Sequence, residues 1–156
     1  MNKLTMTTQQ GVVITLRRVP AYAMANVGSE IRLPKEPLVE VKTVAGIERV
    51  PALQGSPERL QYERELEDAL AAQERARLCF AVNYGVVEWK DGRVTRTQPP
   101  DDWELDPLLG NISTGNRRVD YILFELLTAP DDLTTAIKMI TGEVSEEEIK
   151  ASERLF

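Results

Sequence analysis

The longest uninterrupted pattern along the chain is a helical one, from Ser56 to Tyr84. Ser56 can cap the first free backbone N–H groups, Pro57 suits the first helical position, and Gly85 can turn left-handed and end the helix. The apolar stripe is thin through the middle of this stretch, so we expect the helix to cross a surface or to pair with another chain. Its last turns, Leu78–Tyr84, are apolar on more than one side and are expected to be buried.

Alternating apolar and polar residues predict strands before this helix. Residues 1–10 are polar and are expected to be frayed or extended, whereas Gly11–Val19 is rich in β-branched residues and predicts a strand. Residues 38–50 predict a hairpin, with Val39 and Val41 on one face. Because two strands alone are marginally stable in water, this hairpin must pair with the first strand, dock on the long helix or meet another chain.

The region after the long helix predicts a second hairpin and then helices. The hairpin turns at Asp91–Gly92, a dipeptide favoured in tight turns. An acidic segment and a loop rich in Gly, Ser, Thr and Asn follow it. Helical periodicity then covers residues 116–127 and 130–142, and a capping box at Ser145 opens a third helix. These three segments predict a compact C-terminal helical bundle.

Together these elements predict an α+β fold that is mainly α: an N-terminal strand and hairpin segment, one long central helix and a small C-terminal bundle. A chain of 156 residues has the size of one domain. Within that domain we expect four parts: a β-rich arm and hairpin (1–55), the long helix (56–85), a hairpin with an acidic loop insertion (86–115) and the helical bundle (116–156).

Composition excludes several classes of function. The chain contains no histidine, which removes the commonest general base and the commonest metal ligand. Its net charge of −6 disfavours a nucleic-acid partner. We interpret the two basic pairs, Arg17–Arg18 and Arg117–Arg118, as solvated surface rather than as a phosphate clamp. We interpret the single cysteine, Cys79, as a small apolar residue of the long helix. No apolar stretch of about 20 residues is present to span a membrane.

The acidic clusters at residues 101–106 and 143–148 do not match a calcium loop, which needs oxygen ligands at alternate positions around a central glycine. We therefore predict no catalytic, cofactor-binding or metal-binding residue, no cofactor, and a protein that is not an enzyme. Any enzymatic alternative would be limited to carboxylate chemistry at side chains such as Asp101 and Asp106.

Protein–protein contact is the remaining class of function. Trp89 is expected in the core. Trp103 lies among acids and prolines and is expected either in the core or at an interface. The hairpin offers a strand edge, and the long helix offers a thin apolar seam. The candidate contact residues are Val39, Val41, Leu60, Leu66, Leu70 and Trp103.

Three groups of short motifs are similar to those of a known family. The first joins a strand that ends at Arg18–Val19–Pro20 to the proline-spaced stretch at 34–37 and a Val–Glu–Val strand. The second is Ser56–Pro57 with Tyr62, opening a charged helix that ends at residues 83–86. The third runs from residues 117–121 through 126–127 and 131–133 to an acidic end at Phe156. In these motifs the chain resembles the tail assembly chaperone-like proteins of long-tailed, siphovirus-type bacteriophages. Residues 89–115 have no counterpart in this resemblance.

The resemblance implies a tail morphogenesis protein that holds the tape measure protein, helps to recruit tail tube subunits and forms a homo-oligomer. It implies action in the cytoplasm of the bacterial host. The alternative is a structural protein of the virion, a ring or adaptor at the tail or head–tail junction. In that case the N-terminal arm and hairpin would extend the sheets of neighbouring subunits. Neither alternative involves nucleic acid or a membrane.

Overall fold

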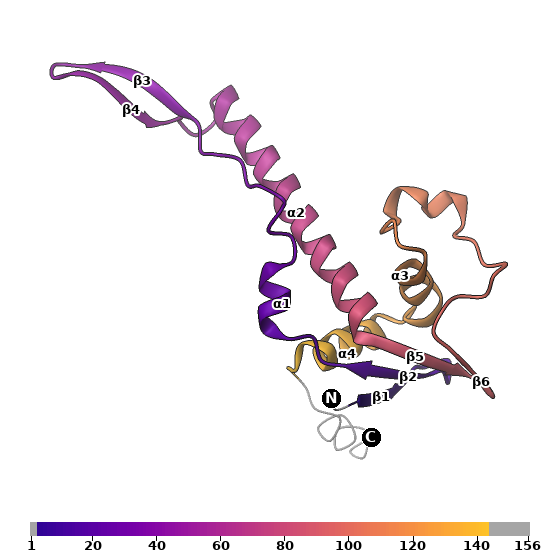
Figure 1. Ribbon diagram of the computed structural model, residues 1–156. Coiled ribbons are helices and arrows are strands. Elements are labelled where there is room, and N and C mark those ends of the chain that lie inside the picture. The colour runs from indigo at the N-terminus through magenta and orange to yellow at the C-terminus, as the bar shows by residue number, and fades with distance from the viewer. Residues whose placement is uncertain (1–2, 144–156) are drawn as a thin grey trace. The chain divides into compact units, whose positions relative to one another are not determined.

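The computed structural model describes residues 3–143 of the chain (Figure 1). The chain divides into two compact units: one comprises Met1–Val27 and Arg77–Phe156, and the other comprises Gly28–Ala76. The long helix α2 (Pro57–Gly85) contributes residues to both. We call them the sheet unit and the hairpin unit. The assignment of the whole chain to a single domain stays a prediction.

A four-stranded antiparallel sheet forms the framework of the sheet unit (Figure 1). Its strands are β1 (Lys3–Thr7), β2 (Val13–Arg17), β5 (Val86–Asp91) and β6 (Val94–Arg96), in the spatial order β1-β2-β5-β6. Residues 3–7, expected to be frayed or extended, are therefore an edge strand, and the pairing of β2 with β5 joins segments about 70 residues apart.

A bulge in β5 orients the largest side chain of the core. Val86 pairs with Leu16, but Glu88 pairs with Thr15, so Val87 is an extra residue in the ladder. Without it, Val86 and Trp89 would point to opposite faces, because side chains alternate along a regular strand. With it, both are buried, at 1% exposure each. The prediction that Trp89 lies in the core is confirmed.

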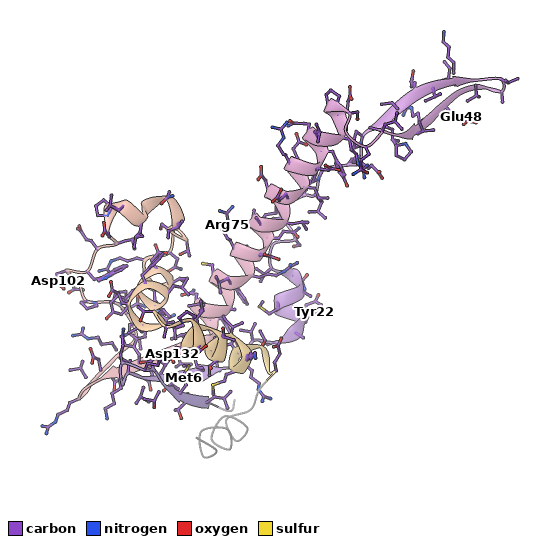
Figure 2. The ribbon with its side chains drawn as sticks, turned by 180° about the vertical axis from the view of Figure 1, so that it is seen from behind. Met6, Tyr22, Glu48, Arg75, Asp102 and Asp132 are labelled. Atoms are coloured by element: carbon purple, nitrogen blue, oxygen red, sulfur yellow. The ribbon has the colours of Figure 1, made fainter. Side chains whose placement is uncertain are left out.

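Helices cover one face of this sheet. The described helices of the sheet unit, besides the end of α2, are α1 (Ala21–Asn26), α3 (Arg117–Tyr121), the π-helix η2 (Ile122–Leu126) and α4 (Pro130–Thr141); a 3₁₀ helix, η1 (Pro107–Ile112), precedes α3. Figure 2 draws the side chains, with Met6 of β1 and Asp132 of α4 labelled. The buried apolar core is a single cluster: Met6, Val12, Ile14, Leu16, Val19, Ala81, Val82, Val86, Trp89, Val119, Ile122, Leu126, Leu127, Ala136, Met139 and Ile140.

The predicted fold class, mainly α with a C-terminal helical bundle, is wrong. The helices that follow residue 116 do not form a separate bundle: their buried residues share one core with the sheet, because Ile14, Leu16 and the two buried residues of β5 supply an apolar surface that needs covering. The hairpin predicted around Asp91–Gly92 is present as β5 and β6, and β5 is in addition an inner strand of that sheet. The third predicted helix, opening at Ser145, lies outside the described residues.

Gly85 does not act as predicted either. It does not have a positive φ, unlike Gly142, which ends α4 in the left-handed conformation at φ 81°. Gly85 is buried as the last residue of α2, and β5 begins at the next residue. The buried end of α2 is confirmed, since Ala81 and Val82 belong to the core cluster.

The hairpin unit contains a two-stranded antiparallel sheet and residues 57–76 of α2. The strands are β3 (Leu38–Thr43) and β4 (Gly46–Pro51), which confirms the predicted hairpin. They pair only with each other among the described strands and do not join β2, the first option considered from the sequence. The single buried apolar side chain described in this unit is Ala52.

Candidate partner-binding surface

The register of the hairpin places Val39 opposite Val50, and Val41 opposite Glu48. These four residues therefore share one face, as predicted for the two valines on β3. Val39 is half-buried, whereas Val41 is exposed. Each strand has one edge without a strand partner among the described residues, so its outward backbone groups are free to pair with another strand.

The end of the hairpin is apolar. Val44 occupies the turn and is fully exposed, and Ile47, the second residue of β4, is 65% exposed. Turn positions usually carry Gly, Asn, Asp or Ser, so a valine there has no evident role in forming the turn. Gly46, with φ 130°, supplies the conformational freedom that the turn requires. We call Val41, Val44 and Ile47 the apolar tip.

Exposed apolar side chains are concentrated in the hairpin unit. It holds about a third of the described residues but eight of the thirteen large hydrophobic side chains that are exposed among them. A surface of this kind is typical of a protein-binding site. The eight are Leu33, Leu38, Val41, Val44, Ile47, Leu53, Leu60 and Leu70.

Residues 28–37 form a strap along one face of α2. The strap begins at Gly28, where φ is 83° and a β-carbon would lie 3.4 Å from the Cα of Gln73. Gln73 Nε2 donates a hydrogen bond to the Ile31 carbonyl at 3.0 Å. At its other end, Arg59 contacts Glu36. Ile31 thus contacts Gln73, whereas Glu36, later in the strap, contacts Arg59, earlier in the helix, so the two segments run antiparallel.

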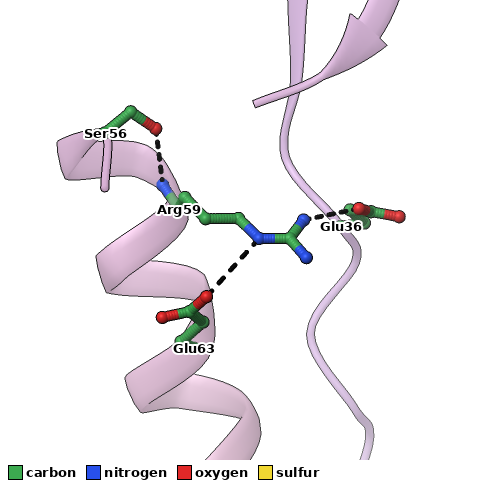
Figure 3. Close-up of polar contacts among 4 residues, drawn as sticks. All are labelled: Glu36, Ser56, Arg59 and Glu63. Atoms are coloured by element: carbon green, nitrogen blue, oxygen red, sulfur yellow. Dashed lines mark hydrogen bonds and ion pairs between the residues drawn. The ribbon is translucent and has the colours of Figure 1, made fainter. Parts of the chain in front are cut away.

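Arg59 connects the start of α2 to the strap (Figure 3). Its backbone N–H donates to Ser56 Oγ at 3.2 Å, which is the capping bond expected at this end of the helix. Its guanidinium donates to Glu36 and lies 3.6 Å from Glu63 Oε1, one turn along the helix. The hydrogen bond to Glu36 is the main reason that the pKa of Arg59 is raised. These contacts fix the strap beside the helix through polar groups.

The three leucines predicted as one seam do not lie on one face. At 100° per residue, Leu66 shares its face with Tyr62 and Gln73, and all three are half-buried, as expected of the face beneath the strap. Leu70 lies beside Leu66 but is 44% exposed, and Leu60 points elsewhere and is 47% exposed. Leu60 and Leu70 are therefore the members of the predicted seam most open to a partner.

Trp103 lies in the sheet unit, apart in sequence from the other candidates. It is half-buried: its Nε1 donates to Glu125 Oε1 at 3.2 Å, and its ring meets Tyr121 edge-on with centroids 5.2 Å apart. Arg117 donates to the Trp103 carbonyl at 2.7 Å and lies near the ring. Trp103 is thus held by its own chain, and its role in binding a partner stays a prediction.

Val44 and Ile47 are the contact candidates that sequence reasoning missed. The signal was present, because a valine between two strands is a poor turn residue. Alternation of apolar and polar residues predicts only that Val39 and Val41 share one face. The register of the strands is needed to show which residues lie at the end of the hairpin.

No group of three or more Cys, Asp or Glu side chains within residues 3–143 is placed to hold a metal ion. None of the helices described is both long enough and apolar enough to cross a bilayer. Comparison of the chain with protein-family models, with curated proteins and with solved structures gives no match.

Proposed function

We propose that this chain is a non-enzymatic tail assembly protein of a long-tailed phage, which binds another tail protein in a chaperone-like manner through the hairpin unit. The observation that carries the proposal is the apolar tip, three exposed aliphatic side chains at the end of a hairpin that stabilise no core. The resemblance described above supplies the partners, the tape measure protein and the tail tube subunits, and the setting, the cytoplasm of the bacterial host.

The physical basis of binding is apolar burial combined with strand addition. Fully burying an aliphatic side chain contributes about 1.5–3 kcal/mol, so the tip can contribute several kcal/mol before the cost of association. Val41 and Ile47 lie on opposite faces of the hairpin, since Val41 pairs with Glu48. An apolar groove that encloses the hairpin would bury both, and a strand of the partner can pair with the outer edge of β3 or β4.

The proposal is tested by co-expressing the chain with the tape measure protein and, separately, with the tail tube protein of the same phage. We expect one of them to co-purify with the wild type. Val44→Asp combined with Ile47→Asp should abolish co-purification. Val94→Asp is the matched control, because Val94 is also an exposed valine on a hairpin but belongs to the sheet unit. Binding unchanged by the double substitution would overturn the role of the tip.

Mass spectrometry of purified virions separates the chaperone from the structural alternative. A chaperone is expected in lysates and absent from virions, whereas stoichiometric recovery from virions would favour a ring or adaptor. In that case the free edges of β3 and β4 would pair with neighbouring subunits.

Self-association through α2 is a second part of the proposal. Leu60 and Leu70 are exposed on a helix segment with no buried residue before Ala81. Substituting both by Asp should lower the molar mass measured by light scattering, while circular dichroism stays that of the wild type. An unchanged mass would count against contact between copies at these leucines.

A further inference from the structure

Two arginines distant in sequence, one from each basic pair, line the same pocket of the sheet unit. Arg17 lies at the end of β2 and Arg118 lies in the first turn of α3. The pocket is open to solvent and has a volume of about 310 Å³. No carboxylate is among the described residues that line it. The other lining residues are Asn83, Val86, Val87, Thr97 and Gln98.

Neutral oxygens hold the guanidinium of Arg118. Nε donates to the Thr97 carbonyl at 2.7 Å, Nη1 donates to the Asn83 carbonyl at 2.9 Å, and Nη2 donates to the Val86 carbonyl at 2.5 Å. Longer bonds reach Asn83 Oδ1 and the Val87 carbonyl. Arg118 is thus rigidly placed, but its positive charge has no carboxylate partner within residues 3–143.

Arg17 is held on one side only. Its Nε donates to the Tyr84 carbonyl at 2.6 Å, and its guanidinium carbon lies 3.9 Å from the centre of the Tyr84 ring. Its two terminal nitrogens make no hydrogen bond or ion pair with the residues that the structure describes. They form the pair of donors with which arginine binds a carboxylate or phosphate through two parallel hydrogen bonds.

The two positive charges act on each other across the pocket. Burial, and secondly the charge of Arg17, lower the pKa of Arg118. An anion between them would relieve this repulsion, and partial burial makes the attraction stronger than at an open surface.

The other polar side chains of the pocket can donate hydrogen bonds to an anion. The backbone carbonyls named above already accept hydrogen bonds from the arginines. A guanidinium only donates, so the atom of Asn83 that faces Arg118 is its oxygen, and the amide NH₂ of Asn83 is left as a donor. The Thr97 hydroxyl and the Gln98 side-chain amide, which also line the pocket, can donate as well. Positive charge and donors together select for an oxyanion.

We propose that this pocket binds an oxyanion, either a carboxylate or a phosphate group. The two terminal nitrogens of Arg17 donate hydrogen bonds to the anion, and Arg118 supplies a second positive charge at a fixed position. The proposal does not rest on the function proposed above. It corrects the interpretation of Arg118 as solvated surface, because this side chain is half-buried and saturated with hydrogen bonds.

Titration of the full chain with inorganic phosphate and, separately, with succinate tests the proposal, with NMR observation of the Val86, Val87, Thr97 and Gln98 amides at constant ionic strength. We expect saturable shifts with at least one of the two anions. Saturation by phosphate alone identifies a phosphate site, and saturation by succinate alone identifies a carboxylate site. Shifts that do not saturate with either anion would overturn the proposal.

Arg17→Gln should weaken the binding at least tenfold. Arg93→Gln is the matched control: it removes the same charge from the exposed β5–β6 turn and should leave the binding unchanged. Arg17→Lys keeps the charge and the packing on Tyr84 but removes the paired donors, so it should bind the anion with intermediate affinity. This variant also keeps the proposal testable if the Gln variant fails to fold. Equal binding by the wild type and both Arg17 variants would also overturn the proposal.

Discussion

Gly85 lies directly against Ile140: a β-carbon at position 85 would lie 2.7 Å from three carbons of the Ile140 side chain. The contact joins the end of α2 to α4, whose Ile140 carbonyl also accepts a hydrogen bond from the Val19 N–H at 2.9 Å. The glycine is therefore required by close packing in the core and not by a left-handed backbone.

Gly85→Ala is expected to destabilise the sheet unit by about 1–3 kcal/mol, the usual cost of overpacking a well-packed core. Urea denaturation followed by tryptophan fluorescence measures it. Gly110→Ala is the control, because nothing lies within 4 Å of a β-carbon there and its φ is not positive. In an Ile140→Ala background the cost of Gly85→Ala should fall; an equal cost in both backgrounds would show that the contact does not cause it.

Asp120 anchors the loop before α3 and provides a second prediction. It is 4% exposed and accepts hydrogen bonds from Ser113 Oγ at 2.6 Å and from the Thr114 N–H and hydroxyl at 2.8 Å each. Asp120→Ala would leave these donors without their acceptor and should cost about 1–3 kcal/mol of unfolding free energy. Asp102→Ala, at an exposed aspartate, should change the urea midpoint little. A midpoint for Asp120→Ala equal to that of the control would contradict the assigned role.

Cys79 should react slowly in the folded protein. Burial is the main cause that raises the pKa of its thiol; a hydrogen bond with Thr114 lowers this pKa in part, and the charge of Asp120 raises it by a lesser amount. The thiolate is the reactive form, so alkylation by iodoacetamide at pH 8 should be slower in the native protein than in urea. Since the native pKa lies above the unfolded value, the associated stability is present below the unfolded pKa and is lost as pH rises through the native pKa. Equal rates with and without urea would refute the prediction.

The strap of residues 28–37 should depend on Gln73. Gln73→Ala removes the hydrogen bond to the Ile31 carbonyl, which is worth about 1 kcal/mol and hence about a fivefold change in local opening. Hydrogen exchange measured by mass spectrometry should therefore become faster at residues 29–37. Gln61→Ala is the control, because Gln61 bonds only to Glu65 on its own helix. Unchanged exchange in the strap would show that other contacts hold it.

Local sequence signals predicted the individual elements. The cap at Ser56 and the charged periodicity that follows predicted α2 to within one residue at each end. Alternation predicted β3 and β4, and the Asp91–Gly92 turn predicted β5 and β6. These features depend on residues within a few positions of one another, so the sequence displays their causes directly.

The partner-binding candidates were only partly predictable. Exposure of Val41 follows from alternation on a hairpin without a covering layer. The half-burial of Leu66 cannot be predicted in this way. Leu66 lies on the helix face beneath the strap, and the strap is held at Gln73 by a hydrogen bond and at Arg59 by an ion pair. The strap cannot be predicted from the sequence, because its proline-spaced residues show no regular pattern of apolar and polar positions.

By itself, the sequence determined the lengths and types of most elements and the absence of histidine chemistry. Only the tertiary structure decided that β2 pairs with β5 across about 70 residues, that Gly85 makes room for Ile140, and that Arg17 and Arg118 line one pocket. The physical reason is the same in each case. Periodicity and capping act between near neighbours along the chain, whereas sheet pairing, close packing and pockets depend on which distant segments fold together.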